Sequence, residues 1–148
     1  MTPAPKTYEL TLTRTIAASP EEVYDAWLDP ALPCNPWCGA VRIDWQPREG
    51  GLWYFLRRMD KEEPLDRPHF GRFRKLVRGQ RIELDWMSYN TRGLESTVTV
   101  TLKAQGDDTL FILKHANIPD DDLGQGHEKG WGHLTSLLEK LLAERKPA

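Results

Sequence analysis

The sequence predicts an α+β fold in which an antiparallel sheet of about six to seven strands curves around one long C-terminal helix. Two observations predict it. Most of the chain consists of short segments in which apolar and polar residues alternate, the period of half-buried strands, separated by turn residues. The last quarter instead carries an apolar stripe at helical spacing, formed by Trp131, Leu134, Leu138, Leu141 and Leu142. Consecutive strands with helices segregated to one side are typical of an α+β domain.

The first elements are a strand and a short helix. Residues 8–16 alternate in the strand pattern. Ser19 is a favourable N-cap, and Glu22 completes a capping box three residues later, so a helix is expected to begin at residue 20 and to end before Asp29. Residues 31–39 are broken by prolines and are expected to form a loop.

The middle of the chain is a run of strands. The period-2 segments that we expect to be strands span residues 41–45, 52–58, 69–77, 80–87, 95–103 and 110–115. The segment from Asp60 to Pro68 is charged and contains prolines, so we expect a connecting loop there. The final helix is expected to open with the segment from Gly126 to Trp131.

Length, charge and hydropathy bound the class of protein. The 148 residues are expected to form a short N-terminal tail (1–6) and a single domain (7–148). A net charge of −2 without a lysine or arginine run argues against nucleic acid as a partner. No apolar run approaches the ~18 residues of a membrane span, and no hydrophobic signal region is present, so we expect no membrane partner and a cytoplasmic location.

Several motifs, in order across nearly the whole chain, resemble the AHSA1-like (activator of heat-shock-protein ATPase homologue) family of the START-like helix-grip superfamily, also called SRPBCC. The segments that carry the resemblance are Thr13–Ile16 leading into Ala18–Trp27, Asp29-Pro30, Pro36-Trp37, Gly50-Gly51 before an aromatic strand, Glu95–Val100, and Gly126-His127 with Gly130-Trp131. The resemblance implies a helix-grip fold with a cavity between the curved sheet and the C-terminal helix. It does not by itself imply a reaction, because members include ligand binders, cyclases and proteins named for a co-chaperone domain.

We expect the cavity to be lined by aromatic and apolar side chains from the inward strand faces and both helices, with a few polar groups among them. The expected lining residues are Trp27, Trp37, Trp53, Phe55, Arg57, Phe73, Trp86, Val98, Phe111, Leu113, His115, His127, Trp131 and Leu134. A pocket for a drug-sized ligand has a volume of roughly 300–1,000 Å³, and we expect a cavity of that size.

The polar candidates each allow two interpretations. His115 shares a strand face with Phe111 and Leu113 and is interpreted as a hydrogen-bonded core histidine, with a general base as the alternative. Arg57 either points into the cavity mouth or reaches solvent. His127 is expected to cap or pack beneath the cavity, whereas His69 and His133 are expected at the surface.

The remaining polar residues predict no metal site and no catalytic motif. Cys34 and Cys38 have neither redox nor zinc spacing, so we expect two thiols packed beside Trp37. The acidic residues 120–122 are expected to favour a helix N-terminus. We expect no cofactor, no metal and no assigned catalytic residue, and an enzyme is the less favoured class.

Three functions from different classes remain open. The leading hypothesis is a cytoplasmic protein that binds a small hydrophobic or aromatic ligand in the cavity. The alternatives are a cyclase or hydrolase that uses the same cavity, with His115 as base and Arg57 orienting an oxygen, and a stress-related, chaperone ATPase-activator-like interaction protein. A chaperone or a second copy of the chain is the corresponding macromolecular partner.

Overall fold

A seven-stranded antiparallel sheet and two helices make up the protein, as seen in a computed structural model that describes residues 6–58 and 66–145. In chain order the elements are β1 (Thr7–Ile16), α1 (Pro20–Leu28), β2 (Arg42–Trp45), β3 (Leu52–Arg58), β4 (Asp66–Val77), β5 (Arg81–Ser88), the 3₁₀ turn η1 (Tyr89–Thr91), β6 (Ser96–Gln105), β7 (Asp108–Pro119) and α2 (Asp122–Arg145). The strand order is β1-β7-β6-β5-β4-β3-β2, so β1 and β2 are the two edges. The predicted α+β architecture is confirmed.

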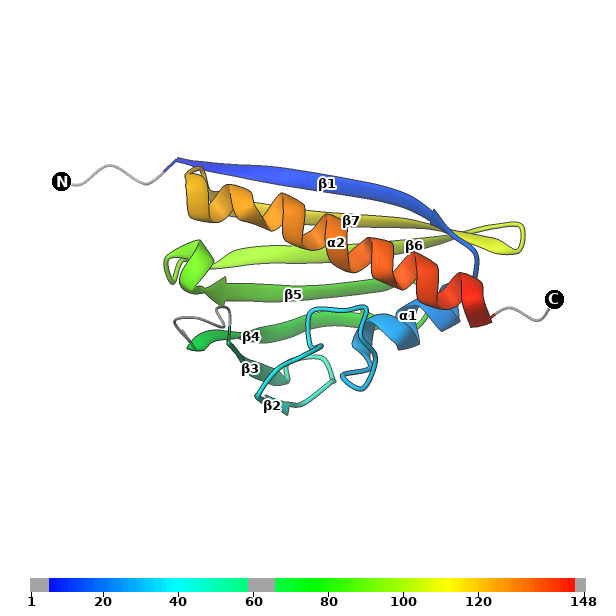
Figure 1. Cartoon of the computed structure of the whole chain (residues 1–148), viewed down its shortest axis with the longest axis horizontal. Helices are drawn as coiled ribbons and strands as arrows, with labels where there is room; N and C mark the ends of the chain where they lie inside the picture. The colour runs from blue at the N-terminus through cyan, green and yellow to red at the C-terminus, as the bar shows by residue number, and fades with distance from the viewer. Residues whose placement is uncertain (1–5, 59–65, 146–148) are drawn as a thin grey trace.

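Helix α2 runs diagonally across one face of the sheet, and α1 lies beside its C-terminal end (Figure 1). The apolar stripe of α2 packs inward as predicted: Trp131, Leu138 and Leu142 are buried. The helix begins about one turn before the predicted start, because Asp121 accepts a hydrogen bond of 2.8 Å from the amide of Gly124 and so satisfies one of the free N–H groups of its first turn. None of the helices in the described part of the chain is long and apolar enough to span a membrane.

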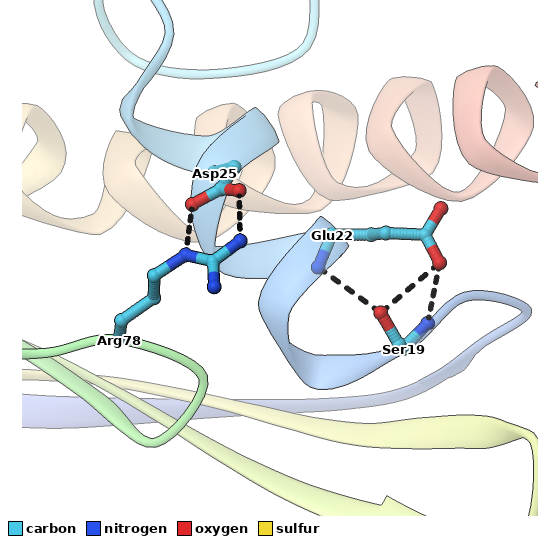
Figure 2. Close-up of polar contacts among 4 residues, drawn as sticks. All are labelled: Ser19, Glu22, Asp25 and Arg78. Carbon is cyan, nitrogen blue, oxygen red and sulfur yellow. Dashed lines mark hydrogen bonds and ion pairs between the residues drawn. The ribbon is translucent and has the colours of Figure 1, made fainter.

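Helix α1 has the capping box that its sequence predicts. The hydroxyl of Ser19 accepts from the Glu22 amide at 3.2 Å, and the Glu22 carboxylate accepts from the Ser19 amide at 3.3 Å (Figure 2). On the outer side of the same helix, Asp25 makes a two-point ion pair with Arg78 at 3.1 and 2.8 Å (Figure 2). This pair ties α1 to the turn between β4 and β5.

The β3–β4 hairpin differs from the prediction at one end. Strand β4 begins at Asp66, whereas the sequence suggested a loop through Pro68; residues 59–65 of that predicted loop lie outside the described residues. Pro68 is paired with Leu56. Because the Leu56 carbonyl accepts from Val41 on the other side of β3, this pair is a non-hydrogen-bonded one, and the missing N–H of proline costs no ladder bond.

Candidate functional site

A cavity of about 140 Å³ opens between helix α2 and the inner face of strands β3 to β5. Its lining residues are Pro36, Phe55, Arg57, His69, Trp86, Asn90, Gly126, His127, Gly130, Trp131 and Leu134. The cavity is smaller than the expected range, because neighbouring aromatic rings fill the space with one another. Trp86 alone has ring centroids of Trp53 and Trp131 at 5.1 and 5.2 Å.

The predicted lining residues divide into two groups. Those that line this cavity are Phe55, Arg57, Trp86, His127, Trp131 and Leu134. The others lie in the buried core around it: Trp27, Trp37, Trp53, Phe73, Val98, Phe111, Leu113 and His115. Strand alternation identified the inward face correctly, but it does not tell which inward side chains end at the cavity and which are covered by their neighbours.

Arg57 lies at the cavity wall, the first of its two predicted positions. Its Nη2 donates to the carbonyl oxygens of Pro36 and Cys38, both at 2.6 Å, and thereby holds the loop after α1 against β3. Burial lowers the pKa of the guanidinium from its usual value. The group is charged all the same, so it places a positive charge at one side of the cavity.

His115 is a core histidine whose two ring nitrogens are both hydrogen-bonded. The indole Nε1 of Trp131 donates to Nδ1 at 3.0 Å, so Nε2 carries the proton of the neutral ring and donates to Ser96 Oγ at 2.8 Å. The Ser96 hydroxyl in turn donates to the Trp86 carbonyl at 2.5 Å. Burial, and the neighbouring His127, lower the pKa of His115 to about 2. With both nitrogens held by fixed partners, His115 is not placed to act as a general base.

His127 lies in the first half of α2 and lines the cavity. Its Nδ1 donates to the Gly124 carbonyl at 2.7 Å, since a carbonyl can only accept, and its ring packs edge-on against His115 at 4.8 Å between centroids. Burial lowers the pKa of His127. The neutral ring therefore keeps an acceptor lone pair on Nε2.

The prediction that His69 lies at the surface is wrong. His69 is 9% exposed, stacks on Phe55 at 4.4 Å and lines the cavity. Its Nδ1 donates to the Arg67 carbonyl at 3.1 Å, which leaves Nε2 as an acceptor in the neutral ring. Burial and the charge of Arg57 lower the pKa of His69 to about 4. His69 is the first residue of the strand expected over residues 69–77, and its parity with Phe73 already indicates the inward face.

Trp86 occupies the centre of the aromatic cluster and is 4% exposed. Its indole N–H has no hydrogen-bond partner among the residues that the structure describes. A buried donor without a partner costs free energy comparable to a lost hydrogen bond, so an acceptor that reached this N–H would be stabilised.

Two glycines of α2 form part of the cavity wall. A β-carbon built on Gly126 or Gly130 meets nothing within 4 Å, so packing does not require glycine at either position. Gly124 is different, because a β-carbon there would collide with the Pro119 carbonyl. Glycine inside a helix costs up to about 1 kcal/mol relative to alanine. Because Gly126 and Gly130 have no side chains, the backbone of α2 itself forms part of the cavity wall at these positions. The apolar pattern of the sequence predicts neither of them as a lining residue.

The opposite face of the sheet carries a larger hollow of about 650 Å³. It is lined by residues of β2 to β5, namely Asp44, Trp45, Gln46, Leu52, Trp53, Tyr54, Phe70, Gly71, Arg72, Asp85 and Met87. Leu52 and Phe70 are 54% and 42% exposed there. We call this hollow the outer groove.

The cysteines and acidic residues form no metal centre among the described residues: no group of three or more histidine, cysteine, aspartate or glutamate side chains is placed to hold an ion. Cys34 and Cys38 are free thiols, and burial raises the pKa of Cys34 to about 11. A thiol with so high a pKa is a poor nucleophile near neutral pH.

Solved structures with this fold include several bacterial proteins. A protein from Chromobacterium violaceum superposes with a TM-score of 0.77 and 24% identity, over 90% of this chain and 96% of that one. The AHSA1 protein from Silicibacter pomeroyi has a TM-score of 0.73 and 23% identity, over 94% of this chain and 100% of that one. DynU16, from the dynemicin biosynthetic locus, has a TM-score of 0.72 and 17% identity, over 94% of this chain and 48% of that one.

At identities of 17–24%, these likenesses show the fold alone. No curated protein matches the sequence. The sequence profile of the family described as "Activator of Hsp90 ATPase homolog 1-like protein" matches residues 17–143, which is most of the chain. That span runs from the capping box of α1 to the last turn of α2 and contains every residue that lines the cavity. The chain therefore belongs to the Activator of Hsp90 ATPase homolog 1-like family.

Proposed function

We propose that this protein binds a small aromatic ligand in the cavity between α2 and the sheet. The observation that carries the proposal is the composition of one wall: the rings of Phe55, Trp86 and Trp131 meet there, and the Trp86 N–H has no hydrogen-bond partner among the described residues. Apolar walls with a few placed polar groups are the usual form of a small-molecule site.

The volume supports a small ligand. An apolar cavity of about 150 Å³ is large enough to bind benzene. A cavity of about 140 Å³ therefore suits one aromatic ring, and we expect further substituents to extend to solvent past Gly126 and Gly130, which line the cavity and are exposed. We also propose that the protein binds this ligand in the cytoplasm.

Titration with toluene, followed by tryptophan fluorescence, tests the proposal. A saturable change is expected, because the ring would displace water from beside the indoles of Trp86 and Trp131. Trp86→Leu should weaken the response, whereas Thr99→Ala on the opposite sheet face should leave it unchanged. Native mass spectrometry of the purified protein would reveal a co-purifying small molecule. A response that is linear in toluene and equal in both variants would contradict the proposal.

The enzyme alternative named His115 as its general base, but both ring nitrogens of His115 are already hydrogen-bonded. His115 therefore does not support this alternative.

The outer groove favours a different second candidate, an interaction protein that contacts a chaperone through the outer sheet face. Its exposed Leu52 and Phe70 are apolar groups of the kind found at protein interfaces. Titration against a purified Hsp90-type chaperone tests it. A complex that is lost in Leu52→Glu but kept in Trp86→Leu would support this candidate, and a complex insensitive to Leu52→Glu would contradict it.

A further inference from the structure

The polar groups around the cavity have a definite hydrogen-bonding pattern. His69 and His127 each use Nδ1–H on a backbone carbonyl, so both neutral rings offer Nε2 as an acceptor. Neither Nε2 has a hydrogen-bond partner among the described residues. Trp86 lines the same cavity, and its N–H is a donor that is also without a partner in this part of the chain.

We propose that the ligand is a single-ring aromatic molecule with a neutral hydroxyl group, a phenol, whose hydroxyl is held by His69 or His127. This inference rests on the proposed function and adds the chemical class of the ligand. A hydroxyl both donates and accepts, so it can donate to an imidazole Nε2 while its oxygen accepts from the Trp86 N–H or from Arg57. The ring then lies against Trp86 and Trp131.

Other ligand classes match this pattern less well. A hydrocarbon leaves the Trp86 N–H and both imidazole acceptors unsatisfied. A carboxylate has acceptors only, so it would suit Arg57 but face the lone pairs of two neutral imidazoles. Burial opposes protonation of both imidazoles by lowering their pKa values, and the positive charge of Arg57 adds to this effect at His69.

The test compares ligands of nearly equal shape by isothermal titration calorimetry. The probes are p-cresol, p-xylene and 4-methylbenzoate. We expect p-cresol to bind about threefold to tenfold more tightly than p-xylene, the effect of one net hydrogen bond. His69→Phe, which keeps a ring stacked on Phe55, and His127→Leu should each be measured for loss of this preference. At least one of them should remove it while retaining p-xylene binding.

A control substitution lies on the same helix as His127. His133→Leu changes an exposed histidine away from the cavity and should preserve the preference for p-cresol. Equal binding of p-cresol and p-xylene would overturn this inference and leave the proposed function standing. Tighter binding of 4-methylbenzoate would overturn it in favour of an anion site at Arg57. Absence of binding by all three probes would overturn the proposed function itself. Circular dichroism and thermal melting of each variant show that it is folded.

Discussion

Trp131 of helix α2 donates its indole N–H to Nδ1 of His115 on strand β7, across 3.0 Å of buried interior. His115 in turn donates from Nε2 to the hydroxyl of Ser96 on β6, and that hydroxyl donates to the Trp86 carbonyl on β5. One chain of hydrogen bonds thus joins the helix to three adjacent strands. It also assigns the tautomer of His115, because each donor in the chain meets an acceptor.

Trp131→Phe should destabilise the protein by about 1–3 kcal/mol, because phenylalanine keeps most of the packing but leaves the His115 acceptor without a donor. Trp131→Ala should cost more, about 3–5 kcal/mol, through the added cavity. Urea denaturation measures both. In a double-mutant cycle, His115→Leu should cost less in the Trp131→Phe background than in the wild type. Strictly additive losses would show that the bond does not couple the two residues.

Acidification should destabilise the fold below about pH 6.5, the pKa of an unfolded histidine. The folded pKa values of His69 and His115 are lowered to about 4 and about 2, so the unfolded chain takes up protons that the folded chain does not. The free energy of unfolding therefore has its full value above pH 6.5. It falls as the pH drops toward 4, by up to about 1.4 kcal/mol per pH unit for each histidine. Chemical denaturation between pH 7 and 4.5 measures this slope.

The matched variants for this pH dependence are His69→Phe and His133→Gln. The first removes a buried histidine and should make the slope shallower. The second removes an exposed one and should leave the slope as it is in the wild type. Identical slopes in all three proteins would argue against the burial of His69.

Ser19→Ala should lower the free energy of unfolding by about 1 kcal/mol, because the Glu22 amide at the start of α1 loses its hydroxyl acceptor. Ser19→Gly should cost only a few tenths of a kcal/mol, since glycine is also a good N-cap. Thermal melting of both variants checks this order. Equal stability of Ser19→Ala and the wild type would contradict the role of the capping box.

Gly130→Leu should stabilise the protein while blocking the cavity. Leucine is a better helix former than glycine by up to about 1 kcal/mol, and its side chain would occupy open space at the cavity wall. Toluene affinity should fall by about tenfold or more, a loss of at least ~1.4 kcal/mol. Gly132→Leu is the matched control: a β-carbon there also meets nothing within 4 Å, but Gly132 does not line the cavity. If both variants bind toluene alike, the opening does not lie beside Gly130.

Local signals predicted most of the fold. The Ser19–Glu22 spacing located the start of α1 correctly, because a capping box depends only on residues within one turn. The inward positions of Val98 and Val100 followed from strand alternation. His69 was misplaced because it stands at the first position of the predicted strand, where a strand end reaches solvent; β4 in fact continues back to Asp66, and the pairing of Pro68 with Leu56 that extends it is a tertiary property.

The site was predictable only in part for a related reason. Strand parity places Trp53, Phe55 and Trp86 on one face, but the space left between them depends on how their rings stack. That arrangement reduced the cavity to about 140 Å³. Gly126 and Gly130 lack side chains, so no apolar pattern marked them as lining residues.

The sequence of helix α2 predicts two halves of different local stability. Its first eleven residues, 122–132, include Gly124, Gly126, Gly130 and Gly132, and its second half carries the buried Leu138 and Leu142. Backbone entropy favours unwinding of the first half, whereas the leucines anchor the second. Amide hydrogens of residues 126–131 should therefore exchange with solvent faster than those of residues 135–142. We expect the turns of α2 before Trp131 to open at a lower free-energy cost than the rest of the protein, and a ring larger than the resting space to enter through that local opening.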